Sequence, residues 1–355
     1  MLINRVAAAR EILRRFEMDA LIVSDIKDIR YLCGFTGSEG ILILGLSKMF
    51  LLVDSRYTTQ ASEETTGCSV VEFREKTASI KSLVDGIRPS NLGFQADSVT
   101  VSLYDELKVA LPDVSLKPIG AELKSLRAVK EPEEVELLEK TAALASEAFQ
   151  RVVSSIAPGI TEKELALMLE FALRSAGADD KAFDFIIASG ERGALPHGRA
   201  SSKVIRSGDL VTIDFGAVKD GYNSDETVTL AVGDPDARQR EIYRTVKDAH
   251  DRALEAVRPG ISLKALDALA RDYIAGKGFG DYFKHGLGHG VGLDVHEKPV
   301  VSFRSEDFAL EGMVFTIEPG IYIPGWGGVR IEDTVCVTAD GCRLLTRVPK
   351  DLVVL

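Results

Sequence analysis

The sequence has few cysteines and no long hydrophobic run. Its 355 residues include four cysteines, and none of them forms a C-x-x-C pair, so neither a disulfide framework nor a zinc site made of thiolates is indicated. No apolar stretch approaches the roughly 18 residues that a membrane-spanning helix requires. The N-terminal segment lacks the uninterrupted apolar core and cleavage site of a signal peptide. These absences favour a cytoplasmic protein with reduced thiols and no membrane partner.

Positive charge is also in deficit. The 43 Lys and Arg residues are outnumbered by 54 Asp and Glu residues, which gives a net charge of −11. A chain of this charge does not attract polyanions, so nucleic-acid binding is not expected. The apolar share of 45% and the charged share of 27% are typical of a globular protein. The length exceeds what one hydrophobic core usually serves, so two domains are expected.

Short apolar runs alternate with helical patterns in the first third of the chain. The runs occupy residues 20–24, 41–46, 49–54, 69–73 and 91–95, which predicts an α/β layered domain. A helix is expected within residues 55–64, with Asp54 and Ser55 as candidate caps. We find no catalytic cluster in this part, and we interpret Asp25, Asp28 and Asp54 as caps or solvated turn residues.

The pattern changes near residue 125. Pro132 is a favoured first-turn residue and opens a long periodic helix. We therefore divide the chain into domains at 1–125 and 126–355. Thr161 and Glu164 have the spacing of a capping box at the start of the next helix. His250 lies on a later helix among charged residues, which predicts a place on the surface.

A short motif occurs twice in the second domain. APGI at 157–160 and RPGI at 258–261 both lie between predicted helices, and both are followed by a Thr or Ser cap. This repetition indicates an internal duplication of a helix pair with its strands.

The segment HGLGHGVGLDVHE at 285–297 holds three of the five histidines. His285 and His289 have the spacing of the helical H-E-x-x-H zinc motif, but the Glu is missing and each intervening glycine would cost about 1 kcal/mol in a helix. We therefore predict a loop or an irregular strand whose metal-binding partners come from elsewhere. A single histidine in such a loop often bonds only to backbone, whereas three together favour a functional site.

Residues 209–233 have the alternating pattern of a β-hairpin. If Lys219 and Asp220 form its tip without a bulge, Asp214 and Asp225 face each other, with Cβ atoms about 4.5–5.5 Å apart. Two carboxylates this close repel each other unless a cation lies between them. Both could instead be solvated hairpin acids, but Asp214 lies in the apolar strand VTIDFG, where an unpaired charge is costly.

A second hairpin at 313–337 repeats this arrangement. Its tip is PGWGG at 324–328, and Glu318 and Glu332 are nearly equidistant from it. Pro319 ends regular strand pairing. Alternation places Arg330 on the same face as Glu332, where it either neutralises a carboxylate or contacts substrate.

Four carboxylates and one or more imidazoles, without a thiolate, form a hard and oxygen-rich ligand set. Such a set suits Mn²⁺, Co²⁺ or Zn²⁺, and shared carboxylates allow two ions about 3.5–4 Å apart. Two ions that share a water lower its pKa from 15.7 toward about 7, which makes hydroxide available to attack a carbonyl. One histidine would complete the coordination, and the others would bond to substrate.

The ordered motifs resemble the pita-bread metallopeptidases, the family of methionine aminopeptidase, Xaa-Pro aminopeptidase and prolidase. They are PHG at 196–198, DFGAxxxGYxSD at 214–225, HGLGHGVGLDVHE at 285–297, TIEPGIY at 316–322 and GVRIED at 328–333. The resemblance spans essentially the whole chain. It implies an α/β (α+β) fold in which an N-terminal creatinase-like α/β domain precedes a pita-bread catalytic domain.

The resemblance also assigns roles to individual residues. It implies that two metal ions are bound by Asp214, Asp225, His289, Glu318 and Glu332, with Asp225 and Glu332 bridging. The substrate-side histidines would be His197, His285 and His296. His285 would lie near the incoming peptide, and His296 would donate to the scissile carbonyl or the intermediate. Arg330 and Glu318 complete the expected catalytic set, and dimerisation is implied by the resemblance alone.

One position departs from the family pattern. Family members commonly read D-x-T-R-T after the second Asp, whereas Val228 stands here in place of the Arg. Alternation turns Val228 away from the ligand side, so we expect metal binding to survive.

These observations predict a homodimeric metallopeptidase that hydrolyses the Xaa-Pro bond by attack of a metal-bridging hydroxide, with Mn²⁺ preferred over Co²⁺ or Zn²⁺. Proline-containing di- or oligopeptides are the expected substrates, and a dipeptidase is favoured over an Xaa-Pro aminopeptidase. A catalytically silent peptide-binding protein and a creatinase-like hydrolase of non-peptide C–N bonds remain as alternatives.

Overall fold

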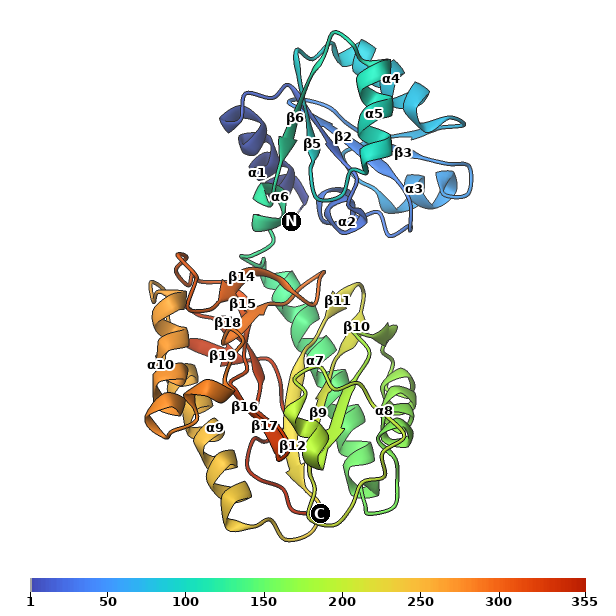
Figure 1. The fold of residues 1–355 in the computed structure, drawn as a ribbon. Helices are drawn as coiled ribbons and strands as arrows, with labels where there is room; N and C mark the ends of the chain where they lie inside the picture. Colours follow the sequence, from blue (N-terminus) through green and yellow to red (C-terminus); the bar gives the residue numbers. More distant parts are fainter. Residues whose placement is uncertain (1) are drawn as a thin grey trace. The chain divides into compact units, whose positions relative to one another are not determined.

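The computed structural model describes residues 2–355, and the chain divides into two compact units between Arg127 and Ala128 (Figure 1). The elements of the first unit are α1 (Leu2–Arg15), β1 (Ala20–Val23), α2 (Ile26–Cys33), β2 (Ile41–Gly45), β3 (Met49–Val53), α3 (Thr58–Glu64), β4 (Ser69–Glu72), α4 (Lys76–Ile87), β5 (Asn91–Gln95), α5 (Val101–Ala110), β6 (Ser115–Ile119) and α6 (Glu122–Ser125).

The first unit is built on one mixed sheet in the order β4-β3-β2-β1-β5-β6. β2 runs antiparallel to both of its neighbours, and the other pairs are parallel. Every residue of β1 and β2 is buried, as expected for central strands of a sheet covered on both faces. Each of the five predicted apolar runs forms a strand, so the α/β prediction is confirmed.

The acids of this unit have varied roles. Asp25 caps α2 by accepting from the backbone N–H groups of Lys27 and Asp28, as predicted. The prediction for Asp28 was wrong, whereas Asp54 is a turn residue, as predicted, but not a helix cap. Asp28 is fully buried and pairs with Arg127 at 2.9 Å. Asp54 and Ser55 do not cap α3, because the N-cap is Tyr57 and Asp54 instead accepts from Arg56.

The second unit carries all the predicted site residues. Its elements are α7 (Pro132–Val152), η1 (Val153–Ser155), α8 (Glu162–Ser175), β7 (Asp180–Lys181), β8 (Ile186–Ser189), η2 (Gly190–Ala194), β9 (Leu210–Phe215), β10 (Ala217–Lys219), β11 (Tyr222–Asn223), β12 (Glu226–Ala231), α9 (Ala237–Ala256), α10 (Leu263–Gly276), η3 (Gly280–Tyr282), β13 (Gly288–Gly290), β14 (Glu297–Val301), β15 (Val314–Ile317), β16 (Gly320–Ile323), β17 (Gly327–Arg330), β18 (Asp333–Val337) and β19 (Cys342–Leu344).

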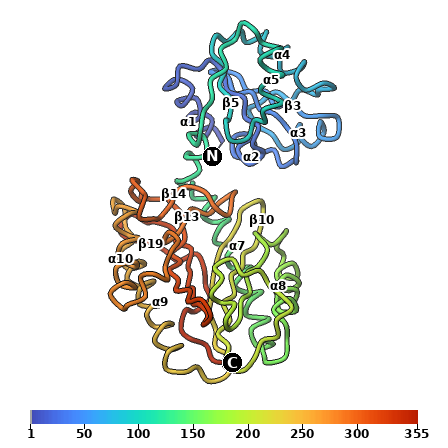
Figure 2. Tube along the Cα trace, viewed as in Figure 1, coloured from blue at the N-terminus to red at the C-terminus, as the bar shows by residue number. Residues whose placement is uncertain are grey.

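This unit has two halves, each with a helix pair and its own strands. α7 and α8 share a hydrophobic core with the sheet β12-β9-β8. α9 and α10 share a second core with strands of the sheet β14-β13-β15-β18-β19 and of the hairpin β16-β17. Figures 1 and 2 show the two helix pairs on opposite sides of this unit, with the strands between them. The strands that carry the predicted ligands therefore meet at the centre of the unit.

The two helix pairs begin their second helices in the same way. Thr161 caps α8 in a capping box with Glu164, as predicted, and Ser262 caps α10. Both capping residues also form an isolated antiparallel bridge to a later segment, Thr161 with Val204 and Ser262 with Phe308. The equivalent construction agrees with the internal duplication that the repeated motif indicates. α7 begins at Pro132, again as predicted.

The predicted surface position of His250 was wrong. His250 on α9 is 1% exposed and does not lie on the surface. Its Nε2 atom lies 3.2 Å from Oδ2 of Asp333 on β18, and its Nδ1 atom lies 3.1 Å from Asp251. His250 shares the buried face of α9 with Val246 and Ala253, which lie four positions before it and three after it, so its charged neighbours in the sequence do not predict its exposure.

Candidate metal centre

The first pair of carboxylates lies at the end of the β9–β12 hairpin. Lys219 pairs with Tyr222, so the tip of this hairpin is formed by Asp220 and Gly221 and not by Lys219 and Asp220 as predicted. Asp214 consequently faces Thr227 and not Asp225. The shift is two residues, and because side chains alternate with a period of two, Asp225 stays on the same face as Asp214, on the diagonal.

The second pair of carboxylates flanks a break between two hairpins. β15 ends at Ile317, β16 begins at Gly320, and Pro319 lies in the gap, as predicted. Thr316 pairs with Thr334 on one side of the break and Gly320 pairs with Arg330 on the other. This common register places Glu318 opposite Glu332. The prediction that the two glutamates are equidistant from the tip is therefore confirmed.

His289 is presented by a short irregular strand, as predicted. β13 pairs with β14 and β15, and the register shifts between His289 and Gly290. A Cβ atom on Gly288 would lie 1.9 Å from the carbonyl oxygen of Thr316, so a side chain at this position is excluded. The glycines of this segment thus allow β13 to pack closely against β15 and bring the imidazole to the carboxylates.

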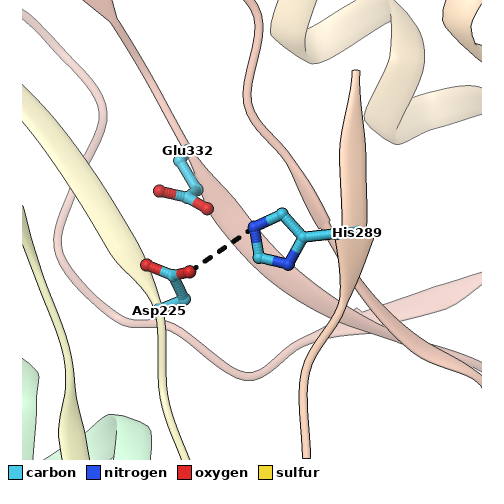
Figure 3. Close-up of side chains that lie close together, drawn as sticks. All are labelled: Asp225, His289 and Glu332. Atoms are coloured by element: carbon cyan, nitrogen blue, oxygen red, sulfur yellow. Dashed lines mark ion pairs between the residues drawn. The ribbon is translucent and has the colours of Figure 1, made fainter. Parts of the chain in front are cut away.

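Three of the predicted ligands form a compact cluster. Asp225, His289 and Glu332 each offer one ligand atom, and these atoms lie within 4.8 Å of one another. Figure 3 shows the three side chains converging from separate segments: Asp225 lies just before β12, His289 lies on β13 and Glu332 lies just before β18. The Nε2 atom of His289 lies 3.6 Å from Oδ2 of Asp225 and 3.3 Å from Oε1 of Glu318. Its Nδ1 atom faces the carbonyl of Gly290 at 3.2 Å, so Nδ1–H donates there and Nε2 is left to face the carboxylates.

Asp214 joins the cluster through Arg330. The Nη2 atom of Arg330 donates to Oδ2 of Asp214 at 2.5 Å. The other oxygen of this carboxylate, Oδ1, is buried and has no hydrogen-bond partner among the described residues. A buried carboxylate oxygen without a donor is costly. An electron-pair acceptor is the partner that this atom requires, and a metal ion meets that requirement.

The pKa values in the cluster follow from burial and crowding. Burial raises the pKa of Asp225 well above its ordinary value, and Glu332 and Asp214 raise it further. Burial likewise raises the pKa of Glu332, with Glu318 as the next cause. For Glu318, burial acts in the same direction, but the hydrogen bond and charge of His289 outweigh it and lower the pKa to about 2. The cluster therefore concentrates more negative charge than its own cations neutralise, which fits a site for divalent cations.

Tyr322 is a site residue that sequence reasoning missed. Its hydroxyl lies 3.0 Å from Nη1 of Arg330 and 3.0 Å from Nε2 of His285. The Nδ1 atom of His285 is 2.8 Å from the carbonyl of Gly286, so both nitrogens of this ring are already bonded within the protein. The tyrosine lies within the quoted motif TIEPGIY, and its position four residues after Glu318 was the available signal, since alternation places both on one face.

Thr227 is a second missed residue. Its hydroxyl donates to Oε2 of Glu332 at 2.6 Å and lies 3.2 Å from Nε of Arg330. Val228, the next residue, is buried in the core shared with α7 and α8. The expectation that Val228 faces away from the ligands is confirmed.

A cavity of about 860 Å³ opens onto the cluster. His197 and His296 are exposed, and the rings of His289 and His296 lie 4.0 Å apart. Partial desolvation within the cavity, and next the neighbouring His289, lower the pKa of His296 below its ordinary value, so the neutral ring is favoured at pH 7. All of the predicted metal-binding and catalytic residues line this cavity: His197, Asp214, Asp225, His285, His289, His296, Glu318, Arg330 and Glu332.

Comparisons with known proteins agree with this geometry. The chain is 40% identical over 352 residues to the Xaa-Pro dipeptidase of Pyrococcus horikoshii, which covers 99% of both chains. A solved structure described as Xaa-Pro dipeptidase from Bacillus anthracis has a TM-score of 0.98 at 40% identity and 100% coverage of both chains. The X-Pro aminopeptidase of Thermotoga maritima has a TM-score of 0.90 at 38% identity and covers 96% of this chain and 98% of its own.

Two family descriptions match successive parts of the chain. Residues 5–129 match the Creatinase/Prolidase N-terminal domain, and residues 136–339 match Metallopeptidase family M24. The predicted fold class, a creatinase-like domain followed by the catalytic domain, is thereby confirmed. None of the helices within residues 2–355 is both long and apolar enough to span a membrane. The cavity lined by candidate metal ligands, the fold and the full-length relatives all agree. The chain is a metallopeptidase and belongs to family M24.

Proposed function

We propose that this protein is an Xaa-Pro dipeptidase whose reaction centre is the cluster of Asp214, Asp225, His289, Glu318 and Glu332. The observation that carries the proposal is the buried Oδ1 atom of Asp214, which lacks a hydrogen-bond partner among the described residues and lies in a cavity lined by three more carboxylates. Full-length relatives named Xaa-Pro dipeptidase supply the substrate class.

The five ligands suit two divalent cations. Asp225 and Glu332 would each hold both ions, as the resemblance to the family implies, and they lie in one cluster with His289. When bound, the two ions supply Lewis acidity that lowers the pKa of a water and polarises the scissile carbonyl. His289 offers Nε2 to one ion, while its Nδ1–H is held by Gly290. The oxygen-rich donor set favours Mn²⁺, with Co²⁺ and Zn²⁺ as alternatives.

The remaining residues hold substrate and site. His296 is exposed in the cavity and neutral, so it can donate a hydrogen bond to the scissile carbonyl as charge develops there. Arg330 is buried, and its donors bond to Asp214, Tyr322, Thr227 and the carbonyl of Pro196. This saturation supports the structural role among the two that the sequence left open. Lys284 is an exposed cation that lines the same cavity, and it could receive a substrate carboxylate.

The alternative is an Xaa-Pro aminopeptidase, which the solved structure from Thermotoga maritima favours. The two activities differ in whether the carboxylate after proline is bound. A charge-assisted contact contributes about 1.5–3 kcal/mol, so a dipeptidase should prefer Ala-Pro to Ala-Pro-Ala by about ten- to a hundredfold in kcat/KM. We would measure hydrolysis of both and of a longer Ala-Pro peptide with Mn²⁺, Co²⁺ and Zn²⁺ in turn. Equal or faster cleavage of the longer peptides would overturn the dipeptidase in favour of the aminopeptidase.

We also propose a cellular compartment and an oligomeric state for this protein. The four cysteines are all free, which supports a reducing compartment and hence the cytoplasm. A homodimer is proposed from the resemblance to the family. Size-exclusion chromatography with light scattering tests that state.

A further inference from the structure

A second cluster of charges lies behind the metal ligands. Glu226 directly follows Asp225, and Asp333 directly follows Glu332, so strand alternation directs them away from the ligand side. Both are buried, with exposed fractions of 0% and 4%. The two halves of the unit therefore each place one buried acid behind a metal-bridging candidate.

One cation serves both acids. The Nζ atom of Lys350 lies 2.5 Å from Oε1 of Glu226 and 3.3 Å from Oδ1 of Asp333. The lysine side chain is 6% exposed. Burial alone would lower its pKa, but Glu226 and Asp333 outweigh this effect and raise it. The ammonium is therefore charged at neutral pH and forms a bridge between β12 and β18.

The segment before Lys350 is bonded to the same two acids. The backbone N–H of Val348 donates to Oε1 of Glu226 at 2.9 Å, and the hydroxyl of Thr346 donates to Oδ1 of Asp333 at 2.5 Å. The hydroxyl of Tyr243 on α9 donates to the carbonyl of Lys350 at 3.1 Å. These bonds fix the backbone of the segment, so the position of the ammonium is well defined.

We propose that Lys350 is a positioning residue for the metal centre: by tying Glu226 to Asp333 it sets the separation of Asp225 and Glu332 on the other side of the same strands. Each acid in contact with the ammonium is one peptide unit from a bridging ligand, and a β-strand transmits a displacement of one residue to the next. Groups behind a metal ligand commonly orient it in this way. The inference rests on the ligands of the proposed function.

The test compares metal affinities of folded proteins. In Lys350→Met the affinity for Mn²⁺, measured by calorimetric titration of chelator-stripped protein, should fall by about 10-fold or more. The electron paramagnetic resonance signal of the bound Mn²⁺ pair should report a changed coupling between the ions. Arg347→Met is the matched control, because Arg347 belongs to the same segment but is 56% exposed and pairs with Glu139. Its metal affinity should equal that of the wild type.

A double variant separates positioning from simple charge compensation. Lys350→Met leaves Glu226 buried without its cation, which is strongly destabilising. Glu226→Gln/Lys350→Met removes the charges of these two residues, and Asp333 keeps its contact with His250, so the double variant should recover folding stability while its metal affinity stays low. Recovery of affinity together with stability would overturn the proposal, as would a folded Lys350→Met protein with wild-type affinity. A wild-type protein that binds no divalent ion would instead refute the proposed function, so the two failures are distinguishable.

Discussion

The two halves of the catalytic unit present matching triplets and use them reciprocally. Asp225, Glu226 and Thr227 in the first half correspond to Glu332, Asp333 and Thr334 in the second. The hydroxyl of Thr227 donates to Oε2 of Glu332, and the hydroxyl of Thr334 donates to the carbonyl of Asp225. Each half therefore supports the proposed bridging ligand of the other, and the cluster takes residues from both halves.

The partner strands break this symmetry. Continuing the β9–β12 register places Gly216 opposite Asp225, where the second half has Glu318 opposite Glu332. A Cβ atom on Gly216 would lie 1.9 Å from the carbonyl oxygen of Ser224, so no ligand can be placed there. The first half supplies its second carboxylate two residues earlier, at Asp214. Similar strands can thus give unequal arrangements of carboxylates, because one position excludes a side chain.

The largest expected effect comes from changing the matching acids themselves. Asp225→Asn and Glu332→Gln each replace a proposed bridging carboxylate by a neutral amide, so both should reduce kcat by at least about 10²-fold and reduce the metal content per chain in parallel. Metal analysis and peptidase assays on the same samples check this. A variant of either residue that keeps two tightly bound ions and normal turnover would show that the halves do not contribute equivalent bridges.

The threonines should behave differently despite their matching positions. Thr227→Val removes a donor to a ligand oxygen, so metal affinity should fall by about 10-fold. Thr334→Val removes a donor to a backbone carbonyl, so the free energy of unfolding should fall by about 1–3 kcal/mol with little change in metal affinity. Calorimetric metal titration and urea denaturation of both variants provide the measurements. The reverse pattern would contradict the different roles that we assign to the two hydrogen bonds, one to a carboxylate and one to a backbone carbonyl.

The smallest effect concerns His250. Of the two buried acids behind the candidate ligands, it contacts Asp333 of the second half and not Glu226 of the first. Burial alone would lower the pKa of His250, but Asp251 and Asp333 outweigh it and raise the pKa. A histidine whose pKa is raised by folding stabilises the fold fully when the pH is below its pKa in the unfolded chain, which is near 6.5. This stabilisation is lost as the pH rises through its pKa in the folded protein. The difference in free energy of unfolding between the wild type and His250→Gln should therefore be larger at pH 6 than at pH 9, by on the order of 1 kcal/mol. Urea denaturation at both pH values measures this difference. An equal difference at both pH values would exclude the charged pair.

The convergence of the candidate ligands could be predicted because side-chain alternation tolerates a particular error. The tip of the first hairpin was placed wrongly, yet Asp214 and Asp225 still share a face, because the register moved by an even number of residues. A shift of one residue would have separated them. The second hairpin was easier to predict, since Pro319 marks the break and Glu318 and Glu332 lie at equal distances from the motif at its tip.

The supporting residues could not be predicted, because their partners are distant in sequence. His250 has charged neighbours, and only its packing against β18 reveals that it is buried beside Asp333. Nothing in the sequence distinguishes Lys350 from a surface lysine. Its burial depends on the C-terminal segment packing behind β12 and β18. Local patterns report which face a side chain occupies, whereas these contacts depend on which elements come to cover that face.

The wide spacing of the ligands also governs how this unit folds. Asp214 and Glu332 lie more than a hundred residues apart, and the ligands between them come from both halves. Closing contacts of this sequence separation is slow and follows the formation of local structure, so the unfolded chain offers no preformed site. Divalent ions therefore select the folded unit, and at a free concentration of 1,000 times Kd a bound ion adds about 4.1 kcal/mol to its free energy of unfolding. The ions would therefore stabilise the catalytic unit against thermal unfolding as well as take part in catalysis.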